Sequence, residues 1–509
     1  MLARVLTFAI DGLESRPVSI EVDVRPGLPS FTIVGLGDAA VRESRERVRA
    51  AILNSGFEFP MRRITANLAP AHLRKVGPGF DLGLAMGLLV ASGQLASEAV
   101  AEYAVFGELS LGGELRDSRG ALAVAEGTRR AGLRGLVLPS GRAAEAALVE
   151  GLEILGTTTL RAAVELLCGG ERPVVEPARV AVSQRAAGSS IDLADVRGHD
   201  SPLRALEIAA AGGHNLLFEG APGTGKTMLA RRLPSILPPL TGEEAIEVTR
   251  IHSLAGLHGD GRGLVTQRPF RAPHHATSVP GLVGGGPAPT PGEASLAHHG
   301  VLFLDELSEF ARSTLEALRQ PLEDGWTTVV RGQRALVFPT RFMLVAATNP
   351  CPCGYAGVAE RCRCSEADLL RHRRKLSGPL LDRLDLLVGV ERPTGEEMKG
   401  SAVTTSAAAR ARVLEARERQ QHRLEGTPAS CNGQMDSAVV RRTVTVAPRA
   451  ATALHRAYET GDLSARGHHR VLRVAQTVAD LRGGTRVEQV DLLTALGLRQ
   501  RQAEARLAA

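Results

Sequence analysis

Aromatic residues and lysine are both scarce in this chain of 509 residues. Phe, Trp and Tyr together make up 3% of it, and nearly all of its 61 basic residues are arginine. No apolar run approaches the roughly 18 residues that a membrane-spanning helix requires, which excludes an integral membrane protein of the helical kind. Because Met1 to Arg4 lead directly into a strand-like segment, we expect no secretory signal, no membrane partner and a cytoplasmic location.

Cysteine is limited to six residues, too few and too clustered for a disulfide scaffold. Four of them stand in the segment CPCGYAGVAERCRC, as two C-x-C pairs with eight residues between them. Such a set can close a tetrahedral thiolate site, so we predict a structural Zn²⁺ here. Four reduced thiols on a loop are the alternative interpretation. The predicted zinc ligands are Cys351, Cys353, Cys362 and Cys364.

Basic residues crowd around these cysteines and continue past them, from Arg361 to Lys375. This is the best local candidate for a surface that contacts a phosphate backbone. A solvated helix face is the alternative, and no aromatic platform for stacking bases accompanies the charges. The net charge of +6 permits nucleic-acid binding without demonstrating it.

One of the few lysines stands in the most informative stretch of the chain, HNLLFEGAPGTGKTMLAR (214–231). Leu216–Phe218 predicts a short buried strand, and residues 228–233 predict a helix. Between them lies the pattern G-x-x-x-x-G-K-[ST], whose glycines let backbone N–H groups surround phosphate oxygens. Lys226 would bind the β- and γ-phosphates and the Thr227 hydroxyl would bind Mg²⁺. The predicted ATP-binding residues of this loop are Gly220, Ala221, Pro222, Gly223, Thr224, Gly225, Lys226 and Thr227.

Three more short apolar runs, at 301–304, 343–347 and 386–390, predict further buried parallel strands. Helical segments separate them, so we expect a doubly wound α/β fold with the nucleotide at the carboxyl edge of the sheet. The first of these runs leads directly into Asp305 and Glu306. An acidic pair at that place can bind Mg²⁺ through one carboxylate and polarise the attacking water through the other, so we predict Asp305 as the metal ligand and Glu306 as the general base. In the alternative interpretation both acids cap the next helix.

The next strand ends at Asn349, whose side chain can orient the attacking water. With the phosphate loop and the acidic pair, this position resembles sensor 1 of AAA+ ATPases. LSGPLLDRLDLLV (376–388) is similar to the AAA+ segment that carries an arginine finger. The resemblance implies that Arg383 completes the site of a neighbouring subunit in a ring of six. Arg383 could instead pair with Asp382 or Asp385.

Two further segments resemble the magnesium-chelatase-like clade of AAA+ proteins, whose inserts project into the ring pore. RPFRAPHHATSVPGLVGGGPAPTPGEASLAHHG (268–300) is similar to the helix-2 insert, and residues 327–338 predict the β-hairpin that precedes sensor 1. We interpret the histidines of the insert as hydrogen-bonding side chains, with metal ligands as the alternative. They are His274, His275, His298 and His299.

The first 170 residues predict an α+β domain. Alternating residues at Val5–Ile10 and Val18–Val24 predict a hairpin. Segments 75–89 and 107–140 resemble the S5-type proteolytic domain of Lon, in which Ser and Lys form a dyad. Gly79 and Val124 stand at the matching places, so the resemblance implies a Lon-like domain without peptidase activity. Further strands are predicted at 31–34 and 63–68, and helices at 39–53 and 81–91.

The end of the chain is predicted to be helical, over 407–424, 435–441, 447–460, 464–482 and 486–508. This arrangement resembles the AAA+ lid. The segment SARGHHRVLRVAQTVADLR (464–482) is similar to the helix that carries sensor 2, whose arginine reaches the γ-phosphate. The resemblance implies Arg473 as an ATP-binding residue, with Arg466 as the second candidate and a surface arginine as the alternative.

These segments together predict an α/β AAA+ P-loop core with a helical lid, preceded by the Lon-protease-like α+β domain. The predicted units are 1–170 (Lon-like domain), 171–195 (linker), 196–395 (ATPase core with the cysteine knuckle) and 396–509 (lid). The combination resembles the YifB/ComM family. The resemblance implies ATP and Mg²⁺ as cofactors, a homohexamer, and a motor that drives branch migration of DNA during natural transformation.

Two other functions compete with a DNA motor. A chelatase-type ATPase would remodel a protein partner so that Mg²⁺ enters a porphyrin, but the N-terminal domain and the cysteine cluster count against it, and we expect no porphyrin partner. An ATP-dependent protease or unfoldase is opposed by Gly79 and Val124, because neither side chain can take part in a dyad. DNA, single-stranded or branched, is therefore the expected partner.

Overall fold

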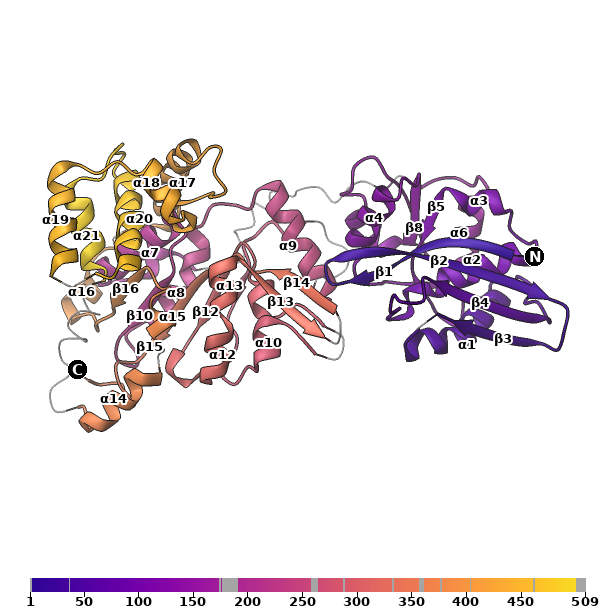
Figure 1. The fold of residues 1–509 in the computed structure, drawn as a ribbon, viewed down its shortest axis with the longest axis horizontal. Helices are drawn as coiled ribbons and strands as arrows, with labels where there is room; N and C mark the ends of the chain where they lie inside the picture. The colour runs from indigo at the N-terminus through magenta and orange to yellow at the C-terminus, as the bar shows by residue number, and fades with distance from the viewer. Residues whose placement is uncertain are drawn as a thin grey trace.

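The computed structural model describes residues 2–35, 37–173, 175, 191–257, 264–286, 289–331, 334–356, 361–375, 378–402, 404–460 and 463–499. Figure 1 shows an elongated molecule with a mixed-sheet domain at one end and a parallel-sheet domain with a helical lid at the other. Of the predicted linker 171–195, residue 174 and residues 176–190 lie outside the described residues. Among the described helices, none has the length and apolar character needed to span a membrane.

The N-terminal domain is built on a 7-stranded sheet with the order β3-β4-β2-β1-β5-β8-β9. The predicted hairpin is confirmed: β1 (Leu2–Asp11) and β2 (Glu14–Arg25) pair antiparallel, and their alternating residues turn one apolar face inward. Strands β5, β8 and β9 extend β1 in parallel register, which makes the sheet mixed. The other strands are β3 (Ser30–Val34), β4 (Arg63–Ala69), β5 (Tyr103–Val105), β6 (Glu108–Leu109), β7 (Leu115–Arg116), β8 (Gly135–Pro139) and β9 (Glu153–Thr157).

The two predicted helices of this domain are present as α1 (Ala39–Asn54) and α2 (Asp81–Ala91). Asp38 caps α1, because its side chain accepts the backbone N–H of Val41 at 2.9 Å. Every residue of α2 is buried, as expected for a helix that is apolar on all sides. The remaining helices are α3 (Ser97–Ala101), α4 (Ala121–Arg130), α5 (Ala143–Ala146) and α6 (Leu160–Leu167).

The second domain contains a 5-stranded sheet with the order β11-β12-β15-β10-β16, in which all neighbouring strands run parallel. Four strands lie at the predicted apolar runs: β10 (Leu216–Glu219), β12 (Val301–Leu304), β15 (Met343–Thr348) and β16 (Leu386–Gly389). The fifth strand, β11 (Phe270–Arg271), is not predicted from the sequence, because two residues carry no strand pattern. The carboxyl ends of β10, β12 and β15 lie at one edge of the sheet.

Helices cover both faces of this sheet. One face packs against α7 (Asp200–Gly212) and α8 (Lys226–Ile236), and the other against α10 (Val279–Val283), α11 (Glu293–Leu296) and α12 (Arg312–Ala317). The predicted hairpin forms as the antiparallel pair β13 and β14. The remaining elements are α9 (Gly242–Leu254), α13 (Arg319–Asp324), β13 (Trp326–Arg331), β14 (Arg334–Pro339), α14 (Glu366–Lys375), α15 (Gly378–Leu381) and α16 (Gly395–Lys399).

The C-terminal helices form a lid that shares one apolar core with α7 and α8. They are α17 (Ser406–Arg423), α18 (Ser437–Thr443), α19 (Pro448–Glu459), α20 (Ala465–Leu481) and α21 (Gln489–Gly497). One prediction is wrong here: the last helix ends at Gly497 and not at residue 508. Leu498 and Arg499 lie beyond the helix, and residues 500–509 lie outside the described chain.

Helix α9 joins the two sheet domains, and Figure 1 shows it facing α4 of the N-terminal domain. The Ser253 hydroxyl at its carboxyl end donates to Glu145 at 2.6 Å and accepts the N–H of Gly120 at 3.2 Å. Arg250, also on α9, forms an ion pair with Glu126. Because Glu145 is fully buried, this junction holds a satisfied polar contact inside the interface.

Candidate active site

The phosphate loop lies between β10 and α8, in the strand–loop–helix order that its sequence predicts. Gly223 and Gly225 adopt φ angles of +77° and +89°, a left-handed conformation that strongly favours glycine. A Cβ atom at Gly220 would lie 2.2 Å from the carbonyl oxygen of Val390. The loop therefore depends on glycine at all three positions, two for backbone conformation and one for close packing.

Lys226 and Asn349 meet at the carboxyl edge of the sheet. The Lys226 ammonium group donates to the carbonyl oxygens of Gly220 at 2.7 Å and Ala221 at 2.8 Å, and to Oδ1 of Asn349 at 3.1 Å. Burial lowers the pKa of Lys226, and the charges of Asp305 and Glu306 oppose that shift. A buried ammonium with three oxygen acceptors is well placed to exchange them for phosphate oxygens.

Thr227 and Asp305 form the second contact at this edge. The Thr227 hydroxyl donates to Oδ2 of Asp305 at 2.7 Å, which joins the first turn of α8 to the end of β12. A threonine hydroxyl and a carboxylate are hard oxygen ligands of the kind that Mg²⁺ binds together with phosphate oxygens. The two predicted metal ligands thus fit the ion, which would neutralise charge on the phosphates when bound.

Glu306 has a backbone conformation that is rare outside glycine, with φ 52° and ψ 50°. Its own N–H donates to Oδ1 of Asp305 at 3.0 Å, and its half-exposed carboxylate lies 3.7 Å from Nδ1 of His275. Such left-handed residues cluster at functional sites, because the surrounding structure must hold them there. The conformation agrees with a functional role for Glu306; its assignment as general base stays a prediction.

Arg383 lies outside this group of contacts. It follows α15, and its guanidinium forms an ion pair with Glu323 of α13. This ion pair therefore involves neither Asp382 nor Asp385, the alternative partners that the sequence offers. Asp385 contacts His214 and Arg473 instead. Only 10% of the Arg383 side chain is exposed, so an arginine finger would have to leave Glu323 before it could reach a neighbouring subunit.

Arg473 connects the lid to the core. Its guanidinium donates to the carbonyl oxygen of Gly433 at 2.7 Å and to Asp385 at 3.4 Å. Burial alone would raise the pKa of Asp385. The positive charge of Arg473 nevertheless helps to hold that pKa well below its usual value. Arg466, the second sensor 2 candidate, is exposed. The ATP contact of Arg473 stays a prediction.

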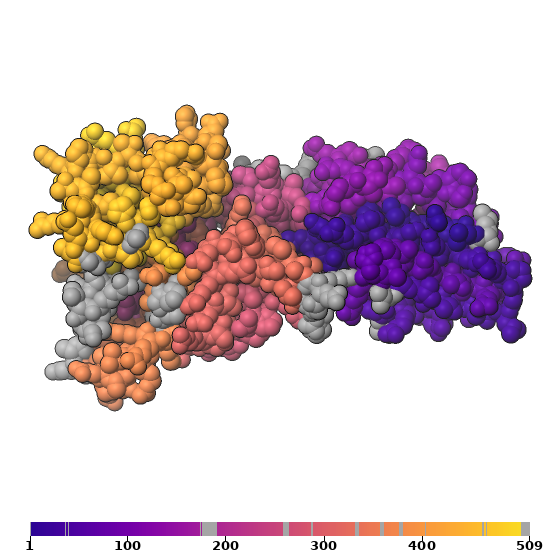
Figure 2. Space-filling model, in the orientation of Figure 1, coloured from indigo at the N-terminus to yellow at the C-terminus, as the bar shows by residue number. Residues whose placement is uncertain are grey.

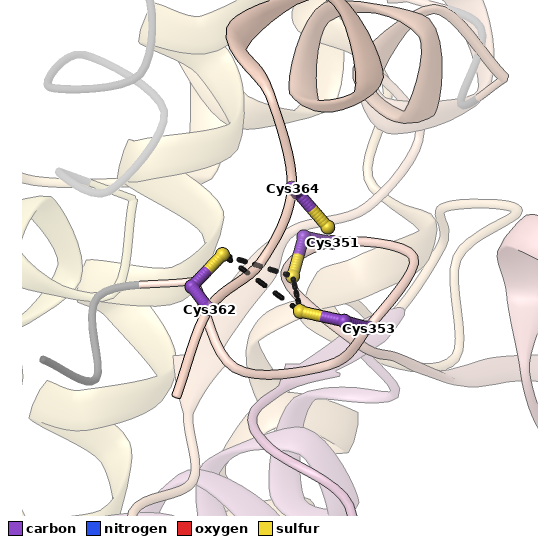
Figure 3. A group of neighbouring side chains, drawn as sticks. All are labelled: Cys351, Cys353, Cys362 and Cys364. Carbon is purple, nitrogen blue, oxygen red and sulfur yellow. Dashed lines mark hydrogen bonds between the residues drawn. The ribbon is translucent and has the colours of Figure 1, made fainter. Parts of the chain in front are cut away.

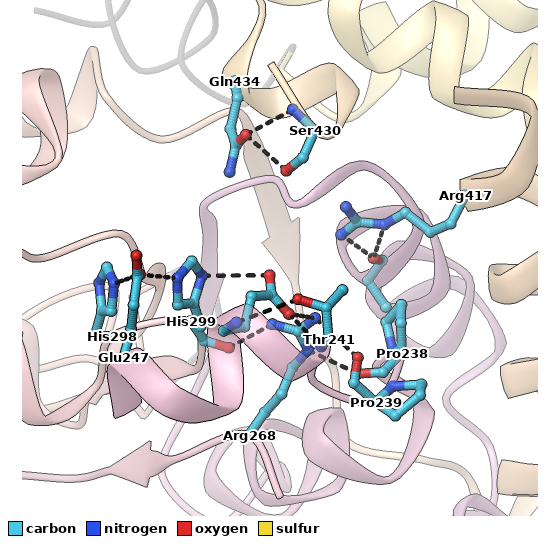
Figure 4. A network of polar contacts seen from close by, with 12 residues as sticks. Pro238, Pro239, Thr241, Glu247, Arg268, His298, His299, Arg417, Ser430 and Gln434 are labelled. Atoms are coloured by element: carbon cyan, nitrogen blue, oxygen red, sulfur yellow. Dashed lines mark hydrogen bonds and ion pairs between the residues drawn. The ribbon is translucent and has the colours of Figure 1, made fainter. Parts of the chain in front are cut away.

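Two histidines of the insert, His298 and His299, contact the same carboxylate. His298 and His299 place their Nε2 atoms 3.0 and 2.8 Å from Oε2 of Glu247, as Figure 4 shows. The backbone N–H of Arg341 donates to Nδ1 of His298 at 3.0 Å, so the neutral ring carries its proton on Nε2 and donates it to Glu247. A nitrogen that carries a proton cannot bind a metal ion. These contacts favour the hydrogen-bonding interpretation, although the three side chains are close enough for a metal site.

The four clustered cysteines come together in space (Figure 3). The Sγ atom of Cys351 lies 3.3 Å from that of Cys353 and 3.9 Å from that of Cys362, and the latter two are 3.7 Å apart. Four thiolates that each lie about 2.3 Å from a tetrahedral Zn²⁺ are about 3.8 Å from one another. Backbone N–H groups of Arg363 and Tyr355 lower the pKa of Cys353 to about 6, which favours a thiolate at that sulfur, whereas burial and the neighbouring sulfurs raise the pKa of Cys362 and of Cys364. The geometry therefore fits a structural zinc ion, and we call the described residues 351–356 and 361–364 the cysteine knuckle.

Two further histidines, His199 and His372, lie near the site and are not predicted from the sequence. His199 is buried beside the phosphate loop, where its Nε2 would lie 3.3 Å from a Cβ atom at Gly225. His372 of α14 is also buried, and its Nε2 lies 2.9 Å from the carbonyl oxygen of Asn349. Neither stands in a pattern that signals its place, because only the fold brings His199 to the phosphate loop and His372 to Asn349.

Comparison with known proteins decides the family. Residues 192–398 match the family described as magnesium chelatase, subunit ChlI, residues 20–142 match subunit ChlI of Mg-chelatase, and residues 403–499 match the ChlI C-terminal family. Competence protein ComM of Haemophilus influenzae is 42% identical over 506 residues, which cover 98% of this chain and 97% of ComM. The uncharacterized protein YifB of Escherichia coli is 42% identical over 496 residues, which cover 97% of this chain and 95% of YifB. The chain belongs to the ComM/YifB family.

Membership of the ComM/YifB family identifies the parallel-sheet domain as a magnesium-chelatase-type AAA+ ATPase domain, and implies ATP with Mg²⁺. An uncharacterized protein of Mycobacterium tuberculosis is also 42% identical over 500 residues, which cover 98% of this chain and 99% of that protein. The N-terminal domain matches a chelatase family, and its likeness to Lon stays an interpretation. The exact unit boundaries predicted from the sequence likewise stay predictions.

Proposed function

We propose that this protein is a ring-forming ATPase that uses ATP hydrolysis to move branched or single-stranded DNA, as a branch-migration motor in recombination or transformation. The observation that carries the ATPase part is the convergence of Lys226, Asn349, Thr227 and Asp305 at one edge of the sheet. The DNA part is supported by the relative whose name is competence protein ComM, since competence is the uptake of DNA.

In this proposal each side chain has one task in hydrolysis. Lys226 binds the β- and γ-phosphates, and Thr227 with Asp305 binds the Mg²⁺ that neutralises their charge. Glu306 polarises the attacking water and accepts its proton, while Asn349 orients that water. Glu306 and Asn349 extend from the ends of β12 and β15, which are neighbouring strands, so both can reach the same γ-phosphate.

Arg383 of an adjacent copy supplies the remaining positive charge, which makes a homohexameric ring the active form. An arginine finger contributes about 10³-fold or more to the rate of hydrolysis. This arrangement can be tested with two inactive variants. Arg383→Ala keeps its own phosphate loop, and Lys226→Ala keeps its own finger, so a mixture of the two should regain ATPase activity that neither has alone. A mixture as inactive as its components would contradict a site shared between subunits.

The β13–β14 hairpin supports contact with a substrate that passes through a ring. Trp326, Val330 and Val337 are exposed on it, at 47%, 70% and 54%. Because the hairpin is separate from the parallel sheet, its exposed apolar side chains are available to contact a polymer.

The deciding experiment measures the ATPase rate with no DNA, with single-stranded DNA and with a four-way junction, together with strand exchange on that junction. Stimulation by DNA and ATP-dependent movement of the junction are expected. No stimulation and no DNA retention in ATP would overturn the DNA motor. The alternative, a chelatase-type ATPase that remodels a protein partner for Mg²⁺ insertion, is favoured by the match of residues 192–398 to chelatase subunit ChlI, and it predicts DNA-independent turnover.

A further inference from the structure

Helix α14 and the cysteine knuckle form a projecting, strongly basic part of the ATPase domain. Figure 1 shows α14 standing away from the sheet, and Figure 2 shows the same segment as a lobe at the lower left of the molecule. Between residues 361 and 375 the chain has six basic residues and two acidic ones. The six are exposed: Arg361, Arg363, Arg371, Arg373, Arg374 and Lys375.

Half of these cations have neither an acidic partner nor a ring contact within the described residues. Arg371 pairs with Asp368 and Lys375 with Glu309, each at 3.5 Å and both exposed, so these pairs contribute little. Arg361 lies over the ring of Tyr355 at 5.9 Å. The unpaired three are Arg363, Arg373 and Arg374. Unpaired, exposed guanidinium groups on a projecting helix are the footprint of a phosphate-backbone contact.

The same helix touches the candidate active site through its one buried polar side chain. His372 stands between Arg371 and Arg373, and only 4% of it is exposed. Its Nε2 lies 2.9 Å from the carbonyl oxygen of Asn349. The Asn349 side chain in turn accepts from Lys226. A displacement of α14 would therefore act directly on the residue predicted to orient the attacking water.

The knuckle makes a second contact with the site. Gly354 has a φ of +84°, and a Cβ atom there would lie 2.5 Å from Cδ of Pro222 in the phosphate loop. The knuckle backbone thus rests on the phosphate loop with no room for a side chain. The four cysteines would hold a zinc ion that keeps the knuckle rigid. A displacement of a rigid knuckle would move Pro222 with it.

We propose that α14 and the knuckle bind the DNA phosphate backbone and transmit that binding to the ATPase site through the His372–Asn349 and Gly354–Pro222 contacts. The surface recognises phosphate and not base identity, because its exposed side chains are mainly guanidinium groups, and the ring of Tyr355 in the knuckle lies under Arg361. This inference rests on the proposed function and adds the place at which DNA regulates ATP hydrolysis.

The DNA contact is tested with the triple variant Arg363→Gln, Arg373→Gln, Arg374→Gln in the full chain. The dissociation constant for a four-way junction is measured from 50 to 200 mM salt in the presence of a slowly hydrolysed ATP analogue. Each lost phosphate contact lowers the slope of log Kd against log salt by about 0.9. We expect the slope to fall by about 2 to 3 and the affinity at low salt to fall about tenfold or more.

A matched control changes three exposed arginines that also lack an acidic partner among the described residues. These are Arg441, Arg442 and Arg449, on α18 and α19. Their triple Gln variant removes the same charge and should keep the slope and affinity of the parent protein. Zinc content and the unfolding midpoint of both variants verify that the knuckle remains folded. The charge-preserving triple Lys variant at 363, 373 and 374 should bind DNA nearly as well as the parent.

Transmission is tested separately with His372→Ala and His372→Gln. The first removes the contact with Asn349, and the second offers an amide N–H that can donate to the same carbonyl. We expect both variants to bind the junction within about twofold of the parent, since neither removes a phosphate contact. DNA stimulation of ATP turnover should be lost in the Ala variant and partly regained in the Gln variant.

The outcomes separate this inference from the proposed function. If the parent protein binds no DNA, the proposed function itself fails. If the parent binds DNA but the triple Gln variant keeps its affinity and slope, α14 is not the contact and the inference is overturned while the DNA motor stands. If His372→Ala keeps full stimulation by DNA, the transmission route is overturned.

Discussion

At the carboxyl ends of β10 and β15, polar side chains contact one another, whereas the two positions of the N-terminal domain that match the Lon dyad are closed by apolar packing. Lys226 contacts Asn349 in the ATPase core. In the N-terminal domain, Val124 is fully buried in an apolar cluster, and a Cβ atom at Gly79 would lie 2.6 Å from the ring of Phe106. Both domains keep an intact sheet, so the fold does not depend on the chemistry at its loops.

The N-terminal domain also has buried charges, and they show how such groups serve structure alone. Asp81 is fully buried and accepts from Arg47 at 2.8 Å, from the N–H of Leu109 at 3.3 Å and from the Ser44 hydroxyl. The protein itself supplies all of these donors. Lys226 instead contacts oxygens that a phosphate can replace. A buried charge thus indicates a functional site when its partners are exchangeable, and not merely because it is buried.

The largest effect that follows is on ATP hydrolysis. Lys226→Ala should lower the rate of ATP hydrolysis by about 10³-fold, because it removes the cation that binds the transferred phosphate. Stability should change little in comparison. Phosphate release in steady state measures the rate. Lys399→Ala, at an exposed lysine of α16, is the matched control and should retain the parent rate. If Lys226→Ala also hydrolysed ATP at the parent rate, the polar contacts at the edge of the parallel sheet would not form an ATPase site.

The second prediction concerns an attempt to give the N-terminal domain a dyad. The double variant Gly79→Ser, Val124→Lys should not cleave casein, and it should destabilise its domain by about 4 kcal/mol, since it places a lysine in an apolar cluster and a side chain against Phe106. Denaturant unfolding and a casein assay measure the two effects. Peptidase activity in a stable double variant would show that only two side chains separate this domain from an enzyme.

Much of this architecture could be predicted from the sequence, because short apolar runs and glycine patterns are local signals. Strands β10, β12, β15 and β16, the phosphate loop and the four grouped cysteines are all local in this sense. Contacts between distant segments were not predictable. Glu323 pairs with Arg383 across 60 positions, and no periodicity in either segment indicates the other.

Dependence on contacts between distant segments also explains the other features that the sequence does not predict. Strand β11 is recognised only because Phe270 and Arg271 lie in register with β12. His372 stands in a basic run and would be taken for another surface residue, yet the fold turns it toward Asn349. The predicted final helix extends too far because helix-forming residues continue past Gly497, whereas Leu498 and Arg499 are no longer helical.

The third prediction tests whether Asp81 is purely structural. Asp81→Asn should destabilise the N-terminal domain by about 3 kcal/mol, since Arg47 loses its buried partner, while ATP turnover per folded molecule stays at the parent value. Hydrogen exchange of the α2 amides measures the loss. Asp23→Asn, which breaks the exposed pair with Arg25, should cost under about 1 kcal/mol. A large fall in ATP turnover with unchanged exchange would instead place Asp81 in communication with the core.

The smallest effect lies inside the ATPase domain, where His298 shows that this domain too has buried polar groups without a catalytic task. Burial lowers the pKa of His298 to about 4, against about 6.5 in the unfolded chain. Since the unfolded state binds the proton more readily, stability is complete above about pH 6.5 and falls by up to about 2 kcal/mol at pH 5.

His298→Asn keeps an acceptor for the N–H of Arg341 and has no proton to gain, so its stability should fall less between pH 7 and pH 5 than that of the parent. Urea unfolding at both pH values measures the difference. The half-exposed Glu247 titrates below this window, because His298 and His299 lower its pKa. The exposed His455→Asn should leave the pH dependence unchanged. If His298→Asn and the parent lost stability equally, the acid sensitivity would belong to another group, and His298 would not be the buried neutral imidazole that its contact with Arg341 implies.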